Sequence, residues 1–182
     1  FMNQFYPGQA LGNSILGTLN SLAKIRQNDV EDFYLRAYQP KNLIVSAAGF
    51  IEHDNLQDEF LTKLKKIKFK KTKQLSSARA ISRSFRAGIE KSADQTHLLV
   101  GFPAASYTSE YRFESFIFNA FLGGGMTSSL YQKLREKKGL AYSIYSSLAS
   151  FTDTGFLTIY VATDKEKVRN VLDILEAELL RI

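Results

Sequence analysis

The chain has 182 residues, with 24 lysines and arginines against 18 aspartates and glutamates, two histidines and no cysteine. A hydrophobic fraction of 45% is typical of a globular protein. A sequence without cysteine excludes disulfides, thiolate-bound zinc or iron–sulfur clusters and a cysteine nucleophile. The longest apolar run, residues 113–122, contains polar residues and falls well short of the roughly 20 apolar residues that a membrane-spanning helix requires. We therefore expect no membrane span.

The positive charge is concentrated in one stretch of the chain. Residues 60–91 contain eleven basic residues and one acidic residue, whereas the rest of the chain is net acidic. Proteins that bind nucleic acid usually spread basic residues over several elements and place aromatic side chains between them. A solvated helix end followed by a linker explains this stretch better, so a nucleic-acid or anionic-membrane surface is the least favoured functional interpretation, and we expect no nucleic-acid partner.

The first part of the chain predicts a helix, a strand and a second helix. Apolar positions at helical spacing predict a helix over 29–38, with Asn28 as its N-cap and Pro40 as its stop signal. The apolar run NLIVSAAGF, residues 42–50, predicts a buried strand. Asp54 or Asn55 is the expected cap of a helix that runs into the lysines. Residues 70–80 show no apolar period, which predicts a linker.

The second part predicts two strands, two helices, a hairpin and a last helix. The strands are expected over 81–90 and 96–102, with Pro103 ending the second, and a helix is expected over 110–122. Three glycines then break the chain before a helix that ends at Gly139. Residues 140–163 alternate at period two about the turn FTDTG, which predicts an antiparallel hairpin, and 165–182 predicts an amphipathic helix. The order predicts an α+β fold with mostly antiparallel sheets flanked by helices.

One stretch carries a resemblance to a known family. Residues 122–163, LGGGMTSSLYQKLREKKGLAYSIYSSLASFTDTGFLTIYVAT, resemble the pitrilysin and mitochondrial processing peptidase family of zinc peptidases. The residues from Gln9 to Leu56, and THLLVGFPAAS at 96–106, are similar to the same family, so the resemblance covers nearly the whole chain except the linker. Its specificity comes from the order of a glycine break, a helix ending in LREKKGLAY and a Thr-Asp-Thr-Gly hairpin.

The resemblance implies that the metal site lies outside this chain. The family carries an inverted His-x-x-Glu-His zinc motif in the first of two homologous α+β domains, and no such motif can be written from His53 or His97. We therefore expect no metal ligand and no catalytic residue in this chain, with zinc held by an upstream domain or a partner subunit. Residues 1–71 would then be the C-terminal part of the zinc-bearing domain, 72–80 a linker, and 81–182 most of the second domain, cut at its C-terminus. The opening residues lack a signal-peptide pattern and are expected to lie within a longer protein.

The resemblance also implies a substrate-binding pair. The family's second domain contributes an arginine and a tyrosine, seven positions apart, that reach the zinc site across the cleft, and Arg135 and Tyr142 fit that spacing and context. A guanidinium and a phenol can hold substrate carbonyls and stabilise a developing oxyanion. The residues alone also fit simpler roles: Arg135 as a solvated residue near a helix C-terminus, and Tyr142 as a half-buried strand residue.

The glycines form a second candidate site. Gly123, Gly124 and Gly125 precede a helix but lack the Lys-Ser/Thr of a phosphate-binding loop, so we interpret them as a tight turn between helices that touches bound peptide in the cleft. The remaining polar candidates have ordinary structural explanations as capping, strand, turn or polar-face residues: His53, His97, Asp153, Glu110 and Glu114.

The sequence thus predicts a fragment of a zinc-dependent metalloendopeptidase that contributes substrate-binding and cleft-closing surface and is inactive alone. The alternative is a non-catalytic partner subunit of the same family. Expected partners are a peptide or unfolded polypeptide substrate and the upstream zinc-bearing domain or partner subunit, in an intact protein that is a dimer.

Overall fold

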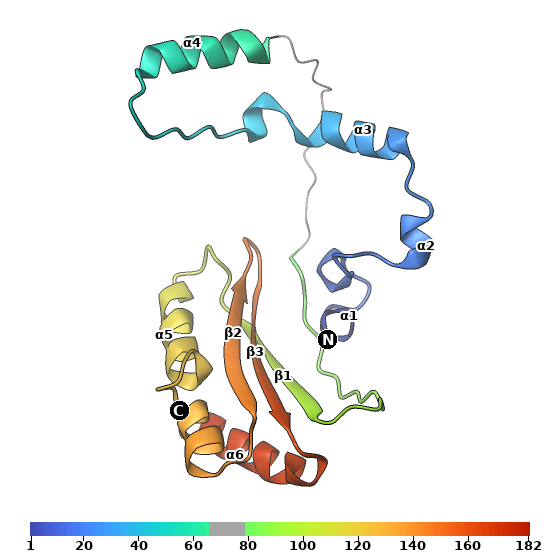
Figure 1. Ribbon diagram of the computed structural model, residues 1–182, viewed down its shortest axis with the longest axis vertical. Coiled ribbons are helices and arrows are strands. Elements are labelled where there is room, and N and C mark those ends of the chain that lie inside the picture. Colours follow the sequence, from blue (N-terminus) through green and yellow to red (C-terminus); the bar gives the residue numbers. More distant parts are fainter. Residues whose placement is uncertain (66–78) are drawn as a thin grey trace. The chain divides into compact units, whose positions relative to one another are not determined.

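The computed structural model describes residues 1–65 and 79–182, and the chain divides into two compact units (Figure 1). One unit consists of Phe1–Asn13 and Ala78–Ile182, and the other of Ser14–Ser77. The first thirteen residues therefore pack with the later part of the chain. The domain boundaries expected at 71 and 81 stay a prediction, and the expected linker lies mostly outside the described residues.

The first unit is built on a three-stranded antiparallel sheet. Its strands are β1 (Thr96–Ala104), β2 (Ser143–Ser150) and β3 (Gly155–Thr163), in the order β1-β3-β2. The predicted hairpin is confirmed as β2 and β3. The prediction that Pro103 ends β1 is wrong, because β1 lies at an edge of this sheet and a proline without an N–H group is tolerated there.

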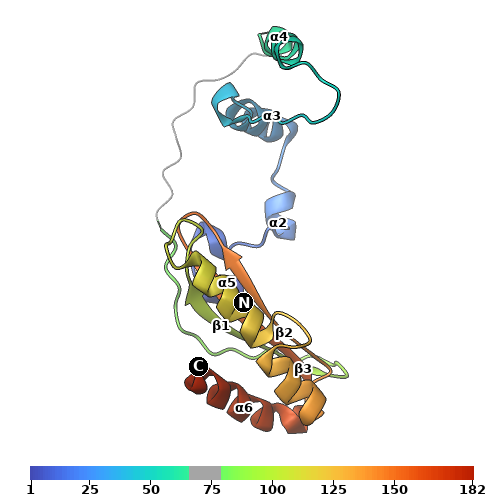
Figure 2. The ribbon, with the colours of Figure 1, turned by 90° about the vertical axis from the view of Figure 1, so that its left-hand side faces the viewer.

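Three helices cover one face of this sheet (Figures 1 and 2). They are α5 (Arg112–Gly123), η3 (Tyr131–Lys137) and α6 (Val168–Arg181), which the short 3₁₀ turn η4 (Lys165–Lys167) precedes. Alternate residues of β2 and β3 point toward the helices and form the core with them. Its fully buried members include Leu122, Leu130, Leu134, Ile159, Val161 and Val171. The mixture of helices and an antiparallel sheet confirms the expected α+β fold.

Residues 1–13 pack against the opposite face of the sheet. Phe156 neighbours the core residue Leu157 in β3 and therefore points the other way. There it meets the rings of Phe1 and Phe5, at centroid distances of 6.2 and 6.3 Å. Gly101 in β1 makes room for this packing, because a Cβ at that position would lie 2.2 Å from the Phe1 ring. The elements in this segment are α1 (Met2–Phe5) and η1 (Ala10–Gly12).

The prediction of a strand over 81–90 is wrong. Residues 81–90 form no regular element and are mostly exposed. The Gln9 side-chain amide donates from Nε2 to the Ile81 carbonyl at 2.7 Å and accepts at Oε1 from the Ile81 N–H at 2.8 Å. The Arg83 N–H donates to the Phe5 carbonyl. These isolated bonds to residues 1–13 replace the continuous ladder that a strand requires.

The second unit contains α2 (Leu19–Leu22), α3 (Gln27–Ala37), η2 (Pro40–Asn42) and α4 (His53–Leu64). The helix expected over 29–38 is confirmed as α3, but it begins earlier. Arg26 rather than Asn28 is the N-cap, and its N–H donates to the Asp29 carboxylate at 2.9 Å. Glu52, rather than Asp54 or Asn55, precedes α4.

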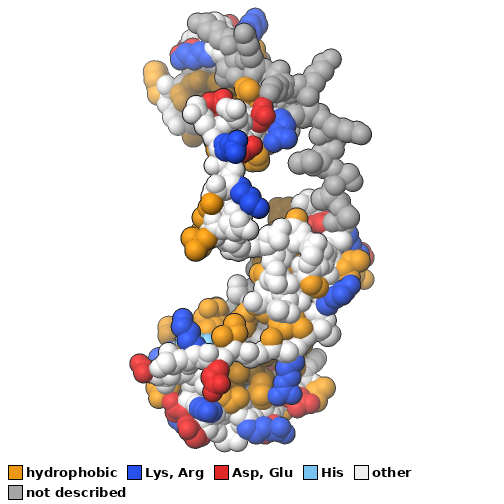
Figure 3. Space-filling view, turned by 90° about the vertical axis from the view of Figure 1, so that its right-hand side faces the viewer, with side chains coloured by type: hydrophobic (Ala, Val, Ile, Leu, Met, Phe, Trp, Pro, Cys, Tyr) orange, Lys and Arg blue, Asp and Glu red, His pale blue; other side chains and the backbone are white. Residues whose placement is uncertain are grey.

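The prediction of a buried strand over 42–50 is also wrong. Beyond η2 these residues form no strand, and Ile44 has 93% of its surface exposed. A strand needs a neighbour to satisfy its backbone groups, and none is present among the described residues of this unit. The three α-helices of the unit bury none of their residues. Hydrophobic side chains accordingly reach the surface in several places (Figure 3).

Candidate functional site

Arg135 lies on a helix that the core holds in place. Leu130 and Leu134 are fully buried, whereas the Arg135 side chain is exposed and its guanidinium carbon lies 5.2 Å from the centre of the Tyr131 ring. Gly139 ends this helical segment with a φ of +57°, a conformation that glycine adopts without steric cost, and its N–H donates to the Arg135 carbonyl. The helix therefore presents a cation to solvent next to a sharp turn.

Tyr142 lies at the other end of this turn, immediately before β2. Its N–H donates to the Ala162 carbonyl at 2.9 Å, which fixes the backbone, while its side chain is exposed. The phenol donates to Asp164 Oδ1 at 3.1 Å, and Lys167 also pairs with Asp164, at 2.8 Å. The hydrogen bond from Lys167 lowers the pKa of Asp164 most, and the bond from Tyr142 acts in the same direction. Asp164 is therefore an ionised acceptor.

The structure places Arg135 and Tyr142 at the two ends of one short connection without joining them. No hydrogen bond links the two side chains: the Tyr142 hydroxyl donates to Asp164, and the Arg135 guanidinium lies over the Tyr131 ring. The sequence pattern did not predict a role for Asp164, which accepts the hydrogen bond that orients the Tyr142 hydroxyl. The hairpin register would have indicated Asp164. It pairs Ser143 with Ala162 and so places Tyr142, the residue before β2, beside the residues that follow β3.

Close packing explains two of the three glycines. A Cβ on Gly123 would lie 2.6 Å from the Ser146 nitrogen of β2, and a Cβ on Gly124 would lie 2.7 Å from the Ala120 Cα. Gly125 has open space around it and its carbonyl accepts from the Ser128 N–H at 3.1 Å. The loop is thus a tight turn after α5, and its contact with a bound peptide stays a prediction.

A groove of about 520 Å³ lies elsewhere on the unit, between η3 and α6. Its lining includes Lys133, Ile174 and Arg181, but neither Arg135 nor Tyr142. The candidate site is therefore an open surface at the turn between η3 and β2.

The histidines are not placed for metal binding. His97 Nδ1 lies 2.7 Å from the Tyr160 hydroxyl, and His53 is the first residue of α4. Across residues 1–65 and 79–182 there is no group of three or more histidine and acidic side chains that could hold a metal ion. The residues present therefore do not fit a zinc ion. In the same part of the chain, no helix has the length and apolar character to cross a membrane.

Residues 24–182 match the family described as the peptidase M16 inactive domain. The chain belongs to the peptidase M16 family. An uncharacterized zinc protease of Streptomyces coelicolor is 33% identical over 186 residues, covering 98% of this chain and 40% of that protein. An uncharacterized zinc protease of Bacillus subtilis is 30% identical over 178 residues, covering 96% of this chain and 42% of that protein. This M16 chain thus spans less than half the length of these relatives.

Solved structures show the same M16 fold. The peptidase M16 inactive domain from Pseudomonas fluorescens has a TM-score of 0.82 at 21% identity and covers 99% of this chain and 45% of that one. A protease from Helicobacter pylori also has a TM-score of 0.82, at 18% identity, with 97% and 45% covered. The family resemblance and the fold class expected from the sequence are confirmed, and the matching part is the domain that the family description calls inactive.

Proposed function

We propose that this chain is the substrate-binding, non-zinc part of an M16 metalloendopeptidase, and that it does not hydrolyse peptides by itself. The observation that carries the proposal is the exposed pair Arg135 and Tyr142, which flank one turn on an inactive-type domain. The zinc ligands would come from an upstream domain or a partner subunit, because the described residues hold no group that fits the metal.

The chemistry of the pair suits an extended peptide. Arg135 offers several N–H donors in a fixed plane, and its backbone is anchored by the buried Leu134. Tyr142 offers one hydroxyl, which Asp164 now accepts from and which a peptide carbonyl could take over. Both groups donate to oxygen, so they favour carbonyls of the substrate backbone and the negative charge that develops when a carbonyl is attacked. Substrate selection would then depend little on side-chain identity, which suits a peptide or unfolded polypeptide.

Residues 14–65 support the assignment to an enclosing, two-domain peptidase. The exposed apolar side chains of α3 and of 43–51, among them Phe33, Ile44 and Phe50, require a partner surface. These relatives are more than twice as long as the present chain, which leaves enough additional residues to form such a partner surface. We propose that this unit completes the upstream zinc-bearing domain and that the first unit, which contains the sheet, contributes cleft-closing surface, in a protein that forms a dimer.

The test uses the full-length protein, the quantity of bound zinc and the cleavage of an unfolded peptide library. Arg135→Ala and Tyr142→Phe should each keep the zinc and lose activity by ~10²-fold, the size of effect seen when one oxyanion donor is removed. Arg169→Ala and Tyr107→Phe, which change exposed residues of the same types, are the matched controls and should keep full activity. Full activity in both site variants would overturn the proposed roles.

A second candidate is a non-catalytic partner subunit of the same family, favoured by the match to the inactive domain. In that case the full-length protein binds no zinc and cleaves nothing alone. Adding a zinc-bearing M16 subunit should then produce activity that Arg135→Ala abolishes. If zinc and cleavage are both present in the single chain, the partner-subunit interpretation is wrong.

A further inference from the structure

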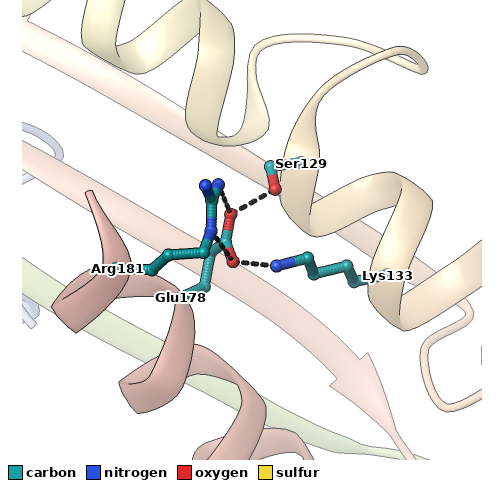
Figure 4. Close-up of polar contacts among 4 residues, drawn as sticks. All are labelled: Ser129, Lys133, Glu178 and Arg181. Carbon is teal, nitrogen blue, oxygen red and sulfur yellow. Dashed lines mark hydrogen bonds and ion pairs between the residues drawn. The ribbon is translucent and has the colours of Figure 1, made fainter.

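Glu178 is a buried carboxylate on α6 that interacts with three side chains (Figure 4). Only 1% of its surface is exposed. Arg181 donates to it from Nη2 at 2.7 Å and from Nε at 3.1 Å, one turn further along the same helix. The Ser129 hydroxyl and the Lys133 ammonium reach it from the helical segment that carries η3. The carboxylate therefore links two helices that are 45 or more residues apart in the sequence.

The charges make this link strong. The hydrogen bond from Arg181 lowers the pKa of Glu178 most, and Lys133 and Ser129 add to it, so that the pKa falls to about 2 although burial opposes this. Glu178 is thus ionised at neutral pH and pairs with two cations. The carboxylate is buried whereas the two cations are partly exposed, so Glu178 would be left as an uncompensated buried charge only if both were removed.

The link acts on the helical segment that presents Arg135. Ser129 and Lys133 are four residues apart and lie on one face, turned toward α6, as Figure 4 shows. Arg135 is two residues beyond Lys133 and is exposed. Any rotation of this segment that breaks the contacts with Glu178 must also move the Arg135 guanidinium.

The backbone of η3 has an unusual helical form. Residues Tyr131–Lys137 form a π-helix, a rare form that occurs mostly as single turns inside α-helices and often at functional sites. The buried Leu130 and Leu134 set the depth of this segment and the face that turns toward the core, but apolar contacts are not directional and restrain its rotation only weakly. The directional contacts to Glu178 supply that restraint.

We propose that Glu178 is a positioning residue for Arg135: it fixes the rotation of the 129–137 helix against α6 and so holds the arginine where substrate binds. This inference rests on the proposed function of Arg135. It assigns to a buried residue of α6, distant in sequence from the site, a part in peptide binding.

The experiment compares Glu178→Gln with Glu176→Gln in the full-length protein, together with the zinc-bearing partner if one is required. Glu176 is an exposed glutamate of the same helix and is the matched control. Hydrogen exchange should become at least tenfold faster in residues 129–137 of Glu178→Gln, with little change in β2 and β3. Cleavage of a quenched-fluorescence peptide should lose about tenfold in kcat/KM, and Glu176→Gln should change neither measurement.

A double-mutant cycle separates positioning from general stability. If Glu178 acts through Arg135, Glu178→Gln should cost nothing further in kcat/KM once Arg135→Ala is present. A residue that only stabilises the fold would instead lower activity by the same factor in both backgrounds. Independent, multiplying effects on kcat/KM would therefore overturn the inference, as would unchanged exchange in residues 129–137.

A milder variant covers the case in which Glu178→Gln does not fold. Ser129→Ala removes one hydrogen bond from the helix side and leaves both ion pairs of Glu178 in place, and the same cycle with Arg135→Ala applies to it. The two proposals fail differently. Full activity in Arg135→Ala overturns the proposed function and with it the positioning of Arg135, whereas exchange in 129–137 tests the anchoring without any activity measurement.

Discussion

Two acidic residues of the first unit, Asp164 and Glu178, differ in their burial. Asp164 pairs with Lys167 near the surface, where water screens the charges and the pair contributes little to stability. Glu178 is itself buried and pairs with Lys133 and Arg181, whose side chains are 37% and 54% exposed, so the carboxylate depends on these partners more than the cations depend on it. Asp164 therefore orients a side chain, and Glu178 holds two helices together.

The low pKa of Glu178 predicts a specific loss of stability in acid. A group whose pKa is lower in the folded protein stabilises the fold at pH values above its unfolded value and loses that contribution as pH falls through the folded value. A change from 4.5 to about 2 corresponds to at most about 3–4 kcal/mol in the free energy of unfolding. That contribution should be complete above about pH 5 and decline between 4.5 and 2. Asp164, whose pKa is also lowered, titrates in both proteins, so urea unfolding across this range should show a steeper decline in the wild type than in Glu178→Gln, and parallel curves would contradict the assignment.

Tyr142→Phe should separate the electrostatic role of the hydroxyl from stability. The side chain is exposed, so the variant should unfold at nearly the same urea concentration as the wild type. Because the Tyr142 hydrogen bond contributes to the lowered pKa of Asp164, that pKa should rise, while Lys167 keeps it below the usual value. An NMR titration of the Asp164 carboxyl carbon measures this, with Tyr107→Phe as the control. An unchanged titration would mean that the hydroxyl does not donate to Asp164 in solution.

At the scale of elements, the C-terminal end of α5 packs so closely against β2 that it requires a glycine at position 123. A Cβ on Gly123 would lie 2.6 Å from a backbone nitrogen that cannot move away, whereas a Cβ on Gly125 would meet open space. Gly123→Ala should therefore destabilise the protein by ~1–3 kcal/mol, the range expected for overpacking, and Gly125→Ala should be close to neutral. Urea unfolding of the two variants measures this, and equal stabilities would contradict the packing explanation for Gly123.

Elements whose backbone hydrogen bonds are made within the element itself could be predicted from the sequence. The hairpin of β2 and β3 contains its own partner strands, and α5 and α6 show a clear helical period, so all were found. The segments 42–50 and 81–90 have strand-like composition but no partner strand among the described residues, and composition alone cannot reveal that. The π-helical form of η3 has no sequence signal that we recognise.

The candidate site could be predicted only in part. Arg135 and Tyr142 came from a family resemblance, because an exposed arginine and a strand tyrosine are common in any protein. Glu178 had a local signal that was not used: it falls on the apolar stripe of α6 that contains Val171 and Leu175. A charged residue on a buried stripe requires partners, but their identity depends on which helix packs against it, and that is a tertiary property.

At the scale of the whole molecule, the two units differ in how they are stabilised. The unit with the sheet has a continuous core in which ten buried apolar residues from helices and strands meet. The described residues of the other unit present amphipathic helices whose apolar side chains, such as Val30 and Phe33, remain exposed. Helices gain most of their stability from packing of the apolar face, so α3 and α4 lack the usual source of it.

This difference predicts that the two units exchange their amide hydrogens at different rates when the 182-residue chain is prepared alone. Amides in β1 and β3 should exchange slowly, since their ladder lies against the core, while those in α3 and α4 should exchange at least tenfold faster. In the full-length protein the helices should become protected if the proposed zinc-bearing domain buries their apolar faces. Slow exchange of α3 and α4 in the isolated chain would show that this unit supports its own fold. In that case its exposed apolar surface would not need an upstream domain, and the proposed two-domain enclosure would lose its main physical support.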